Sequence, residues 1–185
     1  LGEGGIQKNE LTKEAIERGL KTLCNFKEIL NQYEVTNITA IGTSALRNAK
    51  NSDDFVQSVV EKTGIEISII SGEKEAQLIY EGVIYGVSLS EKNHLIMDIG
   101  GGSTEFIHAN SSGLIDAVSL DIGVSRIYQL LNKPEEYTKA DIEFVNAYLN
   151  KQQTIFFTTA NVSILVGSSG SFETIFEMVN KMDFP

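Results

Sequence analysis

The chain has 185 residues, of which 42% are hydrophobic and 22% charged, and its formal net charge is −10. This length suits one or two globular domains with a buried core. No apolar run approaches the roughly 20 residues that span a bilayer, and no basic-then-apolar signal segment opens the chain, so we expect no membrane partner. The acidic balance argues against nonspecific nucleic-acid binding, because phosphate backbones need a high density of Lys and Arg.

The single cysteine, Cys24, excludes an internal disulfide and cannot build a thiolate metal site alone. A reducing, cytoplasmic location fits this cysteine usage. The first residue is Leu1 rather than Met, and we therefore expect a trimmed or partly observed chain.

In the first half of the chain, hydrophobic periodicity predicts helices and strands in alternation. Thr12 is placed to cap the first helix, and Ser52 and Gly64 are placed to start and stop the second. In order, we expect a helix over 11–33, a strand over 38–42, a helix over 52–63, a strand over 65–70 and a helix over 71–88.

The second half continues the alternation. We expect strands over 94–99, 103–109 and 113–123, helices over 124–131 and 138–153, and a final strand, glycine turn and helix within 162–180. Alternating strands and helices predict an α/β architecture in which helices cover a sheet. The polar break near residues 89–93 is the best domain boundary and gives domains 1–91 and 92–185. One continuous domain is the alternative.

The stretch LIMDIGGGSTEFIHA, Leu95–Ala109, places three glycines between two strand-like runs. A hairpin turn favours glycine because a positive φ costs it nothing. Gly100, Gly101 and Gly102, followed by Ser103 and Thr104, leave a bare loop whose N–H groups can converge on an anion. The next segment alternates like a strand, which disfavours a dinucleotide-binding G-x-G-x-x-G turn. A hairpin without a ligand is the alternative.

Two acids flank the glycines. Asp98 ends a buried-looking run, where an ionised carboxylate is costly unless something pairs with it. Glu105 lies on the strand that follows the glycine loop and can face the same end of the hairpin as Asp98. A divalent cation that bridges carboxylates and phosphates would pair with both acids.

These residues resemble a known family. DIGGGSTE looks like the phosphate-binding hairpin of the exopolyphosphatase/guanosine pentaphosphate phosphohydrolase (Ppx/GppA phosphatase) family, in the acetate kinase–actin–Hsp70 superfamily. IGTSALRNAKNSDDF (Ile41–Phe55) and EISIISGEKEAQLIYEGV (Glu66–Val83) are similar to the same family, and the second is its specific signal. LGEG, SLDIGVSRI and VGSSGSFETI also fall in family order.

The resemblance implies a fold of two actin-like (ribonuclease H-like) α/β domains around a cleft, both incomplete here. The family begins with a D-x-G-S-N hairpin that binds phosphate from the other domain. This chain has no such segment, so by family pattern we expect it to start late and end early. The implied activity is hydrolysis of phosphoanhydride bonds, releasing terminal phosphate from inorganic polyphosphate or guanosine pentaphosphate with Mg²⁺. The family also suggests a homodimer.

The resemblance also gives roles to individual residues. Glu75 would be the general base, although an acid in the first turn of a helix can also serve only the helix dipole. Asp98 and Glu105 would hold or orient Mg²⁺. The phosphate contacts would come from Thr43, Ser44, Arg47, Gly100, Gly101, Gly102, Ser103 and Thr104.

Other interpretations stay open. Considered without the resemblance, the Arg47 guanidinium can bind phosphate oxygens or form a salt bridge with Asp53 or Asp54. The chain can alternatively be an actin-like ATP-binding kinase or ATPase in which Glu75 has no catalytic duty. A non-catalytic module that binds polyphosphate or an alarmone is a further alternative.

Overall fold

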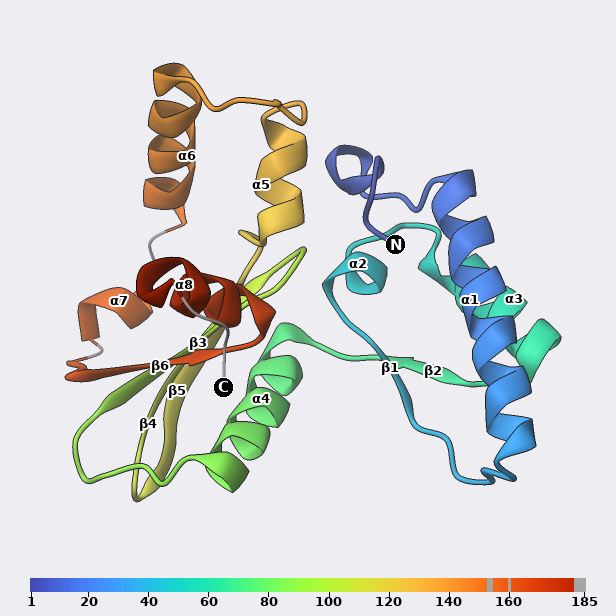
Figure 1. The fold of residues 1–185 in the computed structure, drawn as a ribbon, viewed down its shortest axis with the longest axis horizontal. Coiled ribbons are helices and arrows are strands. Elements are labelled where there is room, and N and C mark those ends of the chain that lie inside the picture. The colour runs from blue at the N-terminus through green and yellow to red at the C-terminus, as the bar shows by residue number, and fades with distance from the viewer. Residues whose placement is uncertain (153–154, 160, 182–185) are drawn as a thin grey trace. The chain divides into compact units, whose positions relative to one another are not determined.

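The computed structural model describes residues 1–152, 155–159 and 161–181, and Figure 1 shows its fold. The chain forms two compact units, Leu1–Ser71 and Gly72–Pro185. This division lies about one helix before the expected boundary at 89–93, because the helix Gly72–Gly86 (α4) packs on the sheet of the second unit. In sequence that helix follows the first unit, but its apolar face is buried in the second.

The first unit contains a two-stranded parallel sheet with helices. Its elements are the 3₁₀ helix η1 (Ile6–Lys8), α1 (Lys13–Gln32), β1 (Ala40–Gly42), α2 (Ser44–Arg47), α3 (Ser52–Thr63) and β2 (Ile67–Ile69). The strands pair with Ala40 opposite Ile67. The core is made by Phe55 and Val59 of α3 with Leu46 and Ile65, against apolar residues of α1.

Two of the three expected helix signals of this unit are confirmed. The Thr12 hydroxyl accepts a hydrogen bond of 3.1 Å from the Ala15 N–H at the start of α1. Gly64 ends α3 in the left-handed region, with φ 69°. The prediction that Ser52 caps α3 is wrong, because Asn51 is the cap residue.

The second unit is built on a four-stranded mixed sheet of order β5-β4-β3-β6. Strands β3 and β4, and β4 and β5, are antiparallel, whereas β3 and β6 are parallel. Besides α4, its elements are β3 (His94–Ile99), β4 (Thr104–Asn110), β5 (Gly113–Leu120), α5 (Val124–Leu130), α6 (Lys139–Lys151), α7 (Ile155–Thr159), β6 (Ile164–Ser168) and α8 (Gly170–Asn180). The mixed strands and helices confirm the α/β prediction.

Helices cover both faces of this sheet. On one face Ala76 of α4 packs with Ile96 of β3 and Ile107 of β4, all fully buried. On the other face the Phe106 ring meets the Phe157 ring of α7 edge to face, with centroids 4.9 Å apart. Successive strand residues point to opposite faces of a sheet. The residues of β4 that share a face with Ile107 therefore lie on the α4 side, and those that share a face with Phe106 lie on the α7 side. No described helix combines the length and apolar character that a membrane-spanning helix needs.

Candidate active site

A row of polar residues crosses the sheet of the second unit. The strand registers pair Ser119 of β5 with Glu105 of β4, Glu105 with Asp98 of β3, and Asp98 with Ser168 of β6. Directly paired residues share a face, so the four side chains lie on one side of the sheet. Ile107 lies two residues after Glu105 in β4, on the same face of the sheet, and it packs with α4. The two predicted metal-binding acids are therefore cross-strand neighbours on the face that α4 covers.

Glu105 is the most constrained of these acids. Only 2% of it is exposed, and the Ser119 hydroxyl donates a hydrogen bond of 2.6 Å to its Oε1. Burial raises the pKa of the Glu105 carboxyl above its ordinary range. Hydrogen bonds from Ser119 and Ser103 oppose that rise, and the charges of Glu75 and Asp98 add to it.

The third acid, Glu75, lies in the first turn of α4 and is partly buried. Its charge adds to the rise that burial causes in the pKa of Glu105. The structure thus places Glu75, Asp98 and Glu105 in one unit, whereas the expected boundary at 89–93 put Glu75 in the first domain. Within residues 1–152, 155–159 and 161–181, no group of three His, Cys, Asp or Glu side chains is placed to hold a metal ion by itself. A cation at these acids would need further oxygen ligands.

The glycine loop connects β3 to β4. The Gly100 N–H donates to the Ser103 carbonyl at 3.0 Å, which closes the turn. Ser103 and Thr104 are buried, and the Thr104 hydroxyl donates to the Ile122 carbonyl at 3.3 Å. The expectation of a positive φ in this loop is wrong: Gly100, Gly101 and Gly102 all lie outside the positive-φ region.

The residue that precedes α5, Gly123, explains the loop conformation. Gly123 lies directly against it: a Cβ atom on Gly123 would sit 2.4 Å from the Gly101 carbonyl carbon and 2.5 Å from the Gly102 nitrogen. The loop is therefore shaped by close contact with the start of α5 rather than by a left-handed turn. Sequence reasoning assigned no role to Gly123, although it stands in the segment SLDIGVSRI that matched the family pattern.

The remaining predicted phosphate contacts belong to the first unit. Arg47 ends α2 and donates from Nη1 to the Ile70 carbonyl at 3.1 Å. Thr43 precedes α2 without a side-chain capping hydrogen bond. Ser44 is 4% exposed, and its Oγ is shielded from solvent with no hydrogen-bond partner among the described residues. Their role as phosphate ligands stays a prediction.

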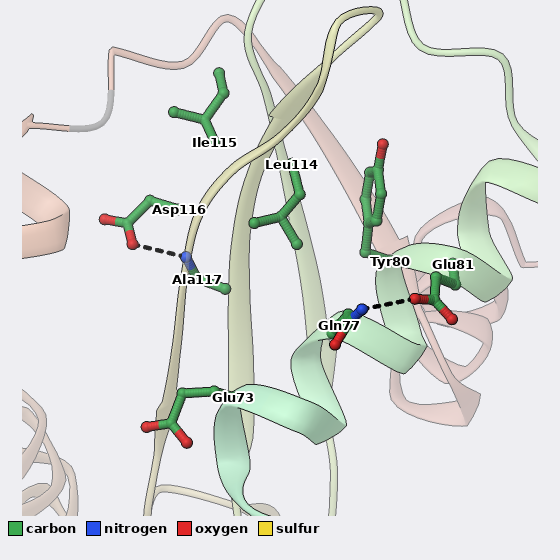
Figure 2. Close-up of a pocket in the computed structure, with 8 residues that line it drawn as sticks. All are labelled: Glu73, Gln77, Tyr80, Glu81, Leu114, Ile115, Asp116 and Ala117. Atoms are coloured by element: carbon green, nitrogen blue, oxygen red, sulfur yellow. Dashed lines mark hydrogen bonds between the residues drawn. The ribbon is translucent and has the colours of Figure 1, made fainter.

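A separate hollow of about 430 Å³ lies between α4 and β5, and Figure 2 shows its lining. Glu73 and Glu81 come from α4 and Asp116 from β5. Gln77 donates from Nε2 to Glu81 at 2.9 Å. The eight described residues that line the hollow include three carboxylates and no Lys or Arg. Because like charges repel, these carboxylates would oppose a polyphosphate unless a cation bound between them.

Comparison with known proteins places the chain among phosphatases. The profile of the Ppx/GppA phosphatase family matches residues 1–183. A bifunctional 3-dehydroquinate synthase/phosphatase of Fusobacterium nucleatum is 37% identical over 193 residues, covering 99% of this chain and 29% of that protein. A guanosine-5'-triphosphate,3'-diphosphate pyrophosphatase of Photobacterium profundum is 32% identical over 182 residues, covering 97% and 36%.

The structural comparison agrees. The crystal structure of an exopolyphosphatase from Cytophaga hutchinsonii superposes with a TM-score of 0.88 at 30% identity, covering 100% of this chain and 61% of that chain. The chain thus spans 29% and 36% of the two curated relatives and less than two thirds of the solved structure. A family match over nearly the whole sequence confirms the resemblance: the chain belongs to the Ppx/GppA phosphatase family.

Proposed function

We propose that the protein containing this chain hydrolyses phosphoanhydride bonds and releases terminal phosphate from inorganic polyphosphate or guanosine pentaphosphate. The observation that carries the proposal is the set of acids around the glycine loop. Glu105 is buried beside its cross-strand neighbour Asp98, and the charges of Asp98 and Glu75 both act on it. Burying a carboxylate among like charges is costly, and a cation bound beside Glu105 and Asp98 would offset that cost.

By the family resemblance, Glu75 takes the role of general base in this proposal. Water attacks the terminal phosphorus, its proton passes to the Glu75 carboxylate, and the anhydride P–O bond breaks with the shortened chain as leaving group. A positioned base contributes about 10²–10⁴-fold to such a step. Backbone N–H groups of Gly101, Gly102 and Ser103 in the glycine loop would offset charge on the phosphoryl oxygens.

The acids fit a Mg²⁺ ion. Asp98 and Glu105 offer hard carboxylate oxygens from adjacent strands, and Mg²⁺ commonly takes one or two carboxylates and completes its shell with phosphate oxygens and water. When bound, the ion supplies positive charge that draws phosphate oxygens to the acids. This division of ligands agrees with the finding that no described set of three acidic, His or Cys side chains holds a metal alone.

The first unit would contribute cationic and polar contacts to the substrate. A planar guanidinium such as that of Arg47 matches phosphate oxygens, and Thr43 lies at the start of the same short helix. The Ser44 hydroxyl is shielded from solvent, so Ser44 would have to become exposed before it could contact a ligand. A homodimer and a cytoplasmic location are further parts of the proposal that rest on the resemblance and on cysteine usage.

Phosphate release from a panel of substrates tests the proposal. Long-chain polyphosphate, guanosine pentaphosphate and ATP would each be incubated with the full-length protein and Mg²⁺. Release from either of the first two at a kcat/KM well above that for ATP is the expected result. Release from ATP alone would support the actin-like ATPase instead. Tight binding of polyphosphate or guanosine pentaphosphate without turnover would support the non-catalytic module.

A further inference from the structure

Residues at the start of α5 donate hydrogen bonds to the carbonyl groups of the glycine loop. The N–H of Val124 donates to the Gly100 carbonyl at 3.0 Å. The N–H groups of Ser125 and Arg126 both donate to the Gly101 carbonyl, at 2.9 and 3.1 Å. The third carbonyl, that of Gly102, accepts from the Arg126 side chain through Nε at 2.9 Å. Three successive peptide units are thereby fixed from one side.

This anchoring sets the direction of the loop N–H groups. In a trans peptide unit the N–H points away from the C=O, and no peptide bond among the described residues is cis. Because the three carbonyls face α5, the N–H groups of Gly101, Gly102 and Ser103 face away from it. Successive backbone N–H groups in a turn can form a concave anion site.

The Arg126 side chain is itself held in place. Its side chain is only 11% exposed, and Nη2 contacts the Asp121 carboxylate at 3.0 Å. One planar guanidinium therefore joins the glycine loop to Asp121, the residue that follows β5, through two of its donors, Nε and Nη2. Lysine has a single flexible ammonium and cannot reproduce this fork.

We propose that Arg126 is a positioning residue for the phosphate site: through the Gly102 carbonyl, and braced by Asp121, it orients the loop N–H groups toward the substrate. The inference rests on the proposed function. It gives a task to the segment SLDIGVSRI, in which Gly123 permits the close approach and Arg126 completes the anchoring. Arg126 acts through the loop backbone and makes no contact with the reacting atoms.

The test is the affinity of the full-length protein for tripolyphosphate with Mg²⁺, measured by calorimetry at a temperature where circular dichroism shows every variant folded. Arg126→Met should weaken binding by about tenfold or more, since a hydrogen bond from a charged donor is lost. Arg126→Lys should restore only part of it. Arg18→Met is the control, because Arg18 makes an exposed ion pair with Glu3 in the first unit, and it should bind as wild type does.

Asp121→Ala separates positioning from simple charge. It removes a negative charge near a polyanion site, so attraction alone predicts tighter binding, whereas loss of the brace predicts weaker binding. The inference is overturned if folded Arg126→Met keeps wild-type affinity. It is also overturned if Arg126→Lys restores affinity fully while Asp121→Ala tightens binding. A wild-type protein that neither binds nor cleaves tripolyphosphate, polyphosphate or guanosine pentaphosphate refutes the proposed function itself, and this inference with it.

Discussion

Ser119 and Glu105 face each other across β5 and β4, and the serine hydroxyl donates a hydrogen bond of 2.6 Å to the buried carboxylate. The hydroxyl holds one of the two carboxylate oxygens. Glu105 therefore presents a fixed edge to the neighbouring Asp98 rather than turning freely. The two acids proposed to hold Mg²⁺ are oriented by the sheet itself.

Ser119→Ala should weaken the response to Mg²⁺ more than it weakens the fold. Hydrogen bonds to charged groups are worth about 1.5–3 kcal/mol, so we expect the Mg²⁺ midpoint for phosphate release and for tripolyphosphate binding to rise by about tenfold. Ser119→Thr keeps the hydroxyl and should restore most of the response. Identical Mg²⁺ titrations for wild type and Ser119→Ala would show that the hydrogen bond does not prepare the metal site.

Glu105→Gln should stabilise the metal-free protein at alkaline pH. The pKa of Glu105 is raised by burial and by neighbouring acids, so the folded protein binds this proton more tightly than the unfolded chain. Below the ordinary pKa of 4.5 both states are protonated and the side chain carries no penalty. The penalty grows as pH rises through the higher folded pKa. The amide oxygen of glutamine can still accept from Ser119.

Thermal midpoints in EDTA check this prediction. Glu105→Gln should melt above wild type at pH 8, and the difference should vanish near pH 4. Glu17→Gln, which changes an exposed acid on α1, should show no such pH-dependent gain. A Glu105→Gln protein that melts below wild type at pH 8 would mean that the carboxylate is stabilised, not strained, by its surroundings.

Gly123→Ala should damage stability and binding much more than Gly101→Ala, although only Gly101 belongs to the glycine run. A Cβ at Gly123 would collide with the backbone of the loop at 2.4 Å, whereas a Cβ at Gly101 would meet Ser125 Oγ at an ordinary 3.4 Å. Overpacking of this kind costs about 1–3 kcal/mol. Melting curves and tripolyphosphate affinity should therefore change strongly for Gly123→Ala and little for Gly101→Ala. Equal loss in both variants would contradict the close approach at Gly123.

The sequence was informative where the signal is local. Thr12 caps α1 as predicted, because the capping bond spans three residues. The strands around the glycine run are also confirmed, and their antiparallel pairing brings Asp98 opposite Glu105. Short helices were missed: α2 has four residues and α7 five, too few for a period of 3.6 to show.

Contacts between distant segments carried no such signal. Asn51 was not recognised as the start of α3, because its side-chain amide instead bonds the backbone of Leu11, 40 residues away. Arg126 reaches Gly102 over 24 residues. The packing of α4 on β4 and β5, which moves the unit boundary to Ser71, likewise depends on the folded sheet.

Phosphate release by Glu75→Gln compared with Glu73→Gln is the most direct test of the central claim, that Glu75 activates water in a phosphoanhydride hydrolase. The two acids stand two residues apart in the first turn of α4, but Glu75 influences Glu105 while Glu73 is exposed and lines the separate acidic hollow. With polyphosphate or guanosine pentaphosphate and Mg²⁺, single-turnover release should fall about 10²–10⁴-fold in Glu75→Gln with binding kept, and should stay near wild type in Glu73→Gln. Near-wild-type release by Glu75→Gln, or equal loss in both variants, would contradict the account.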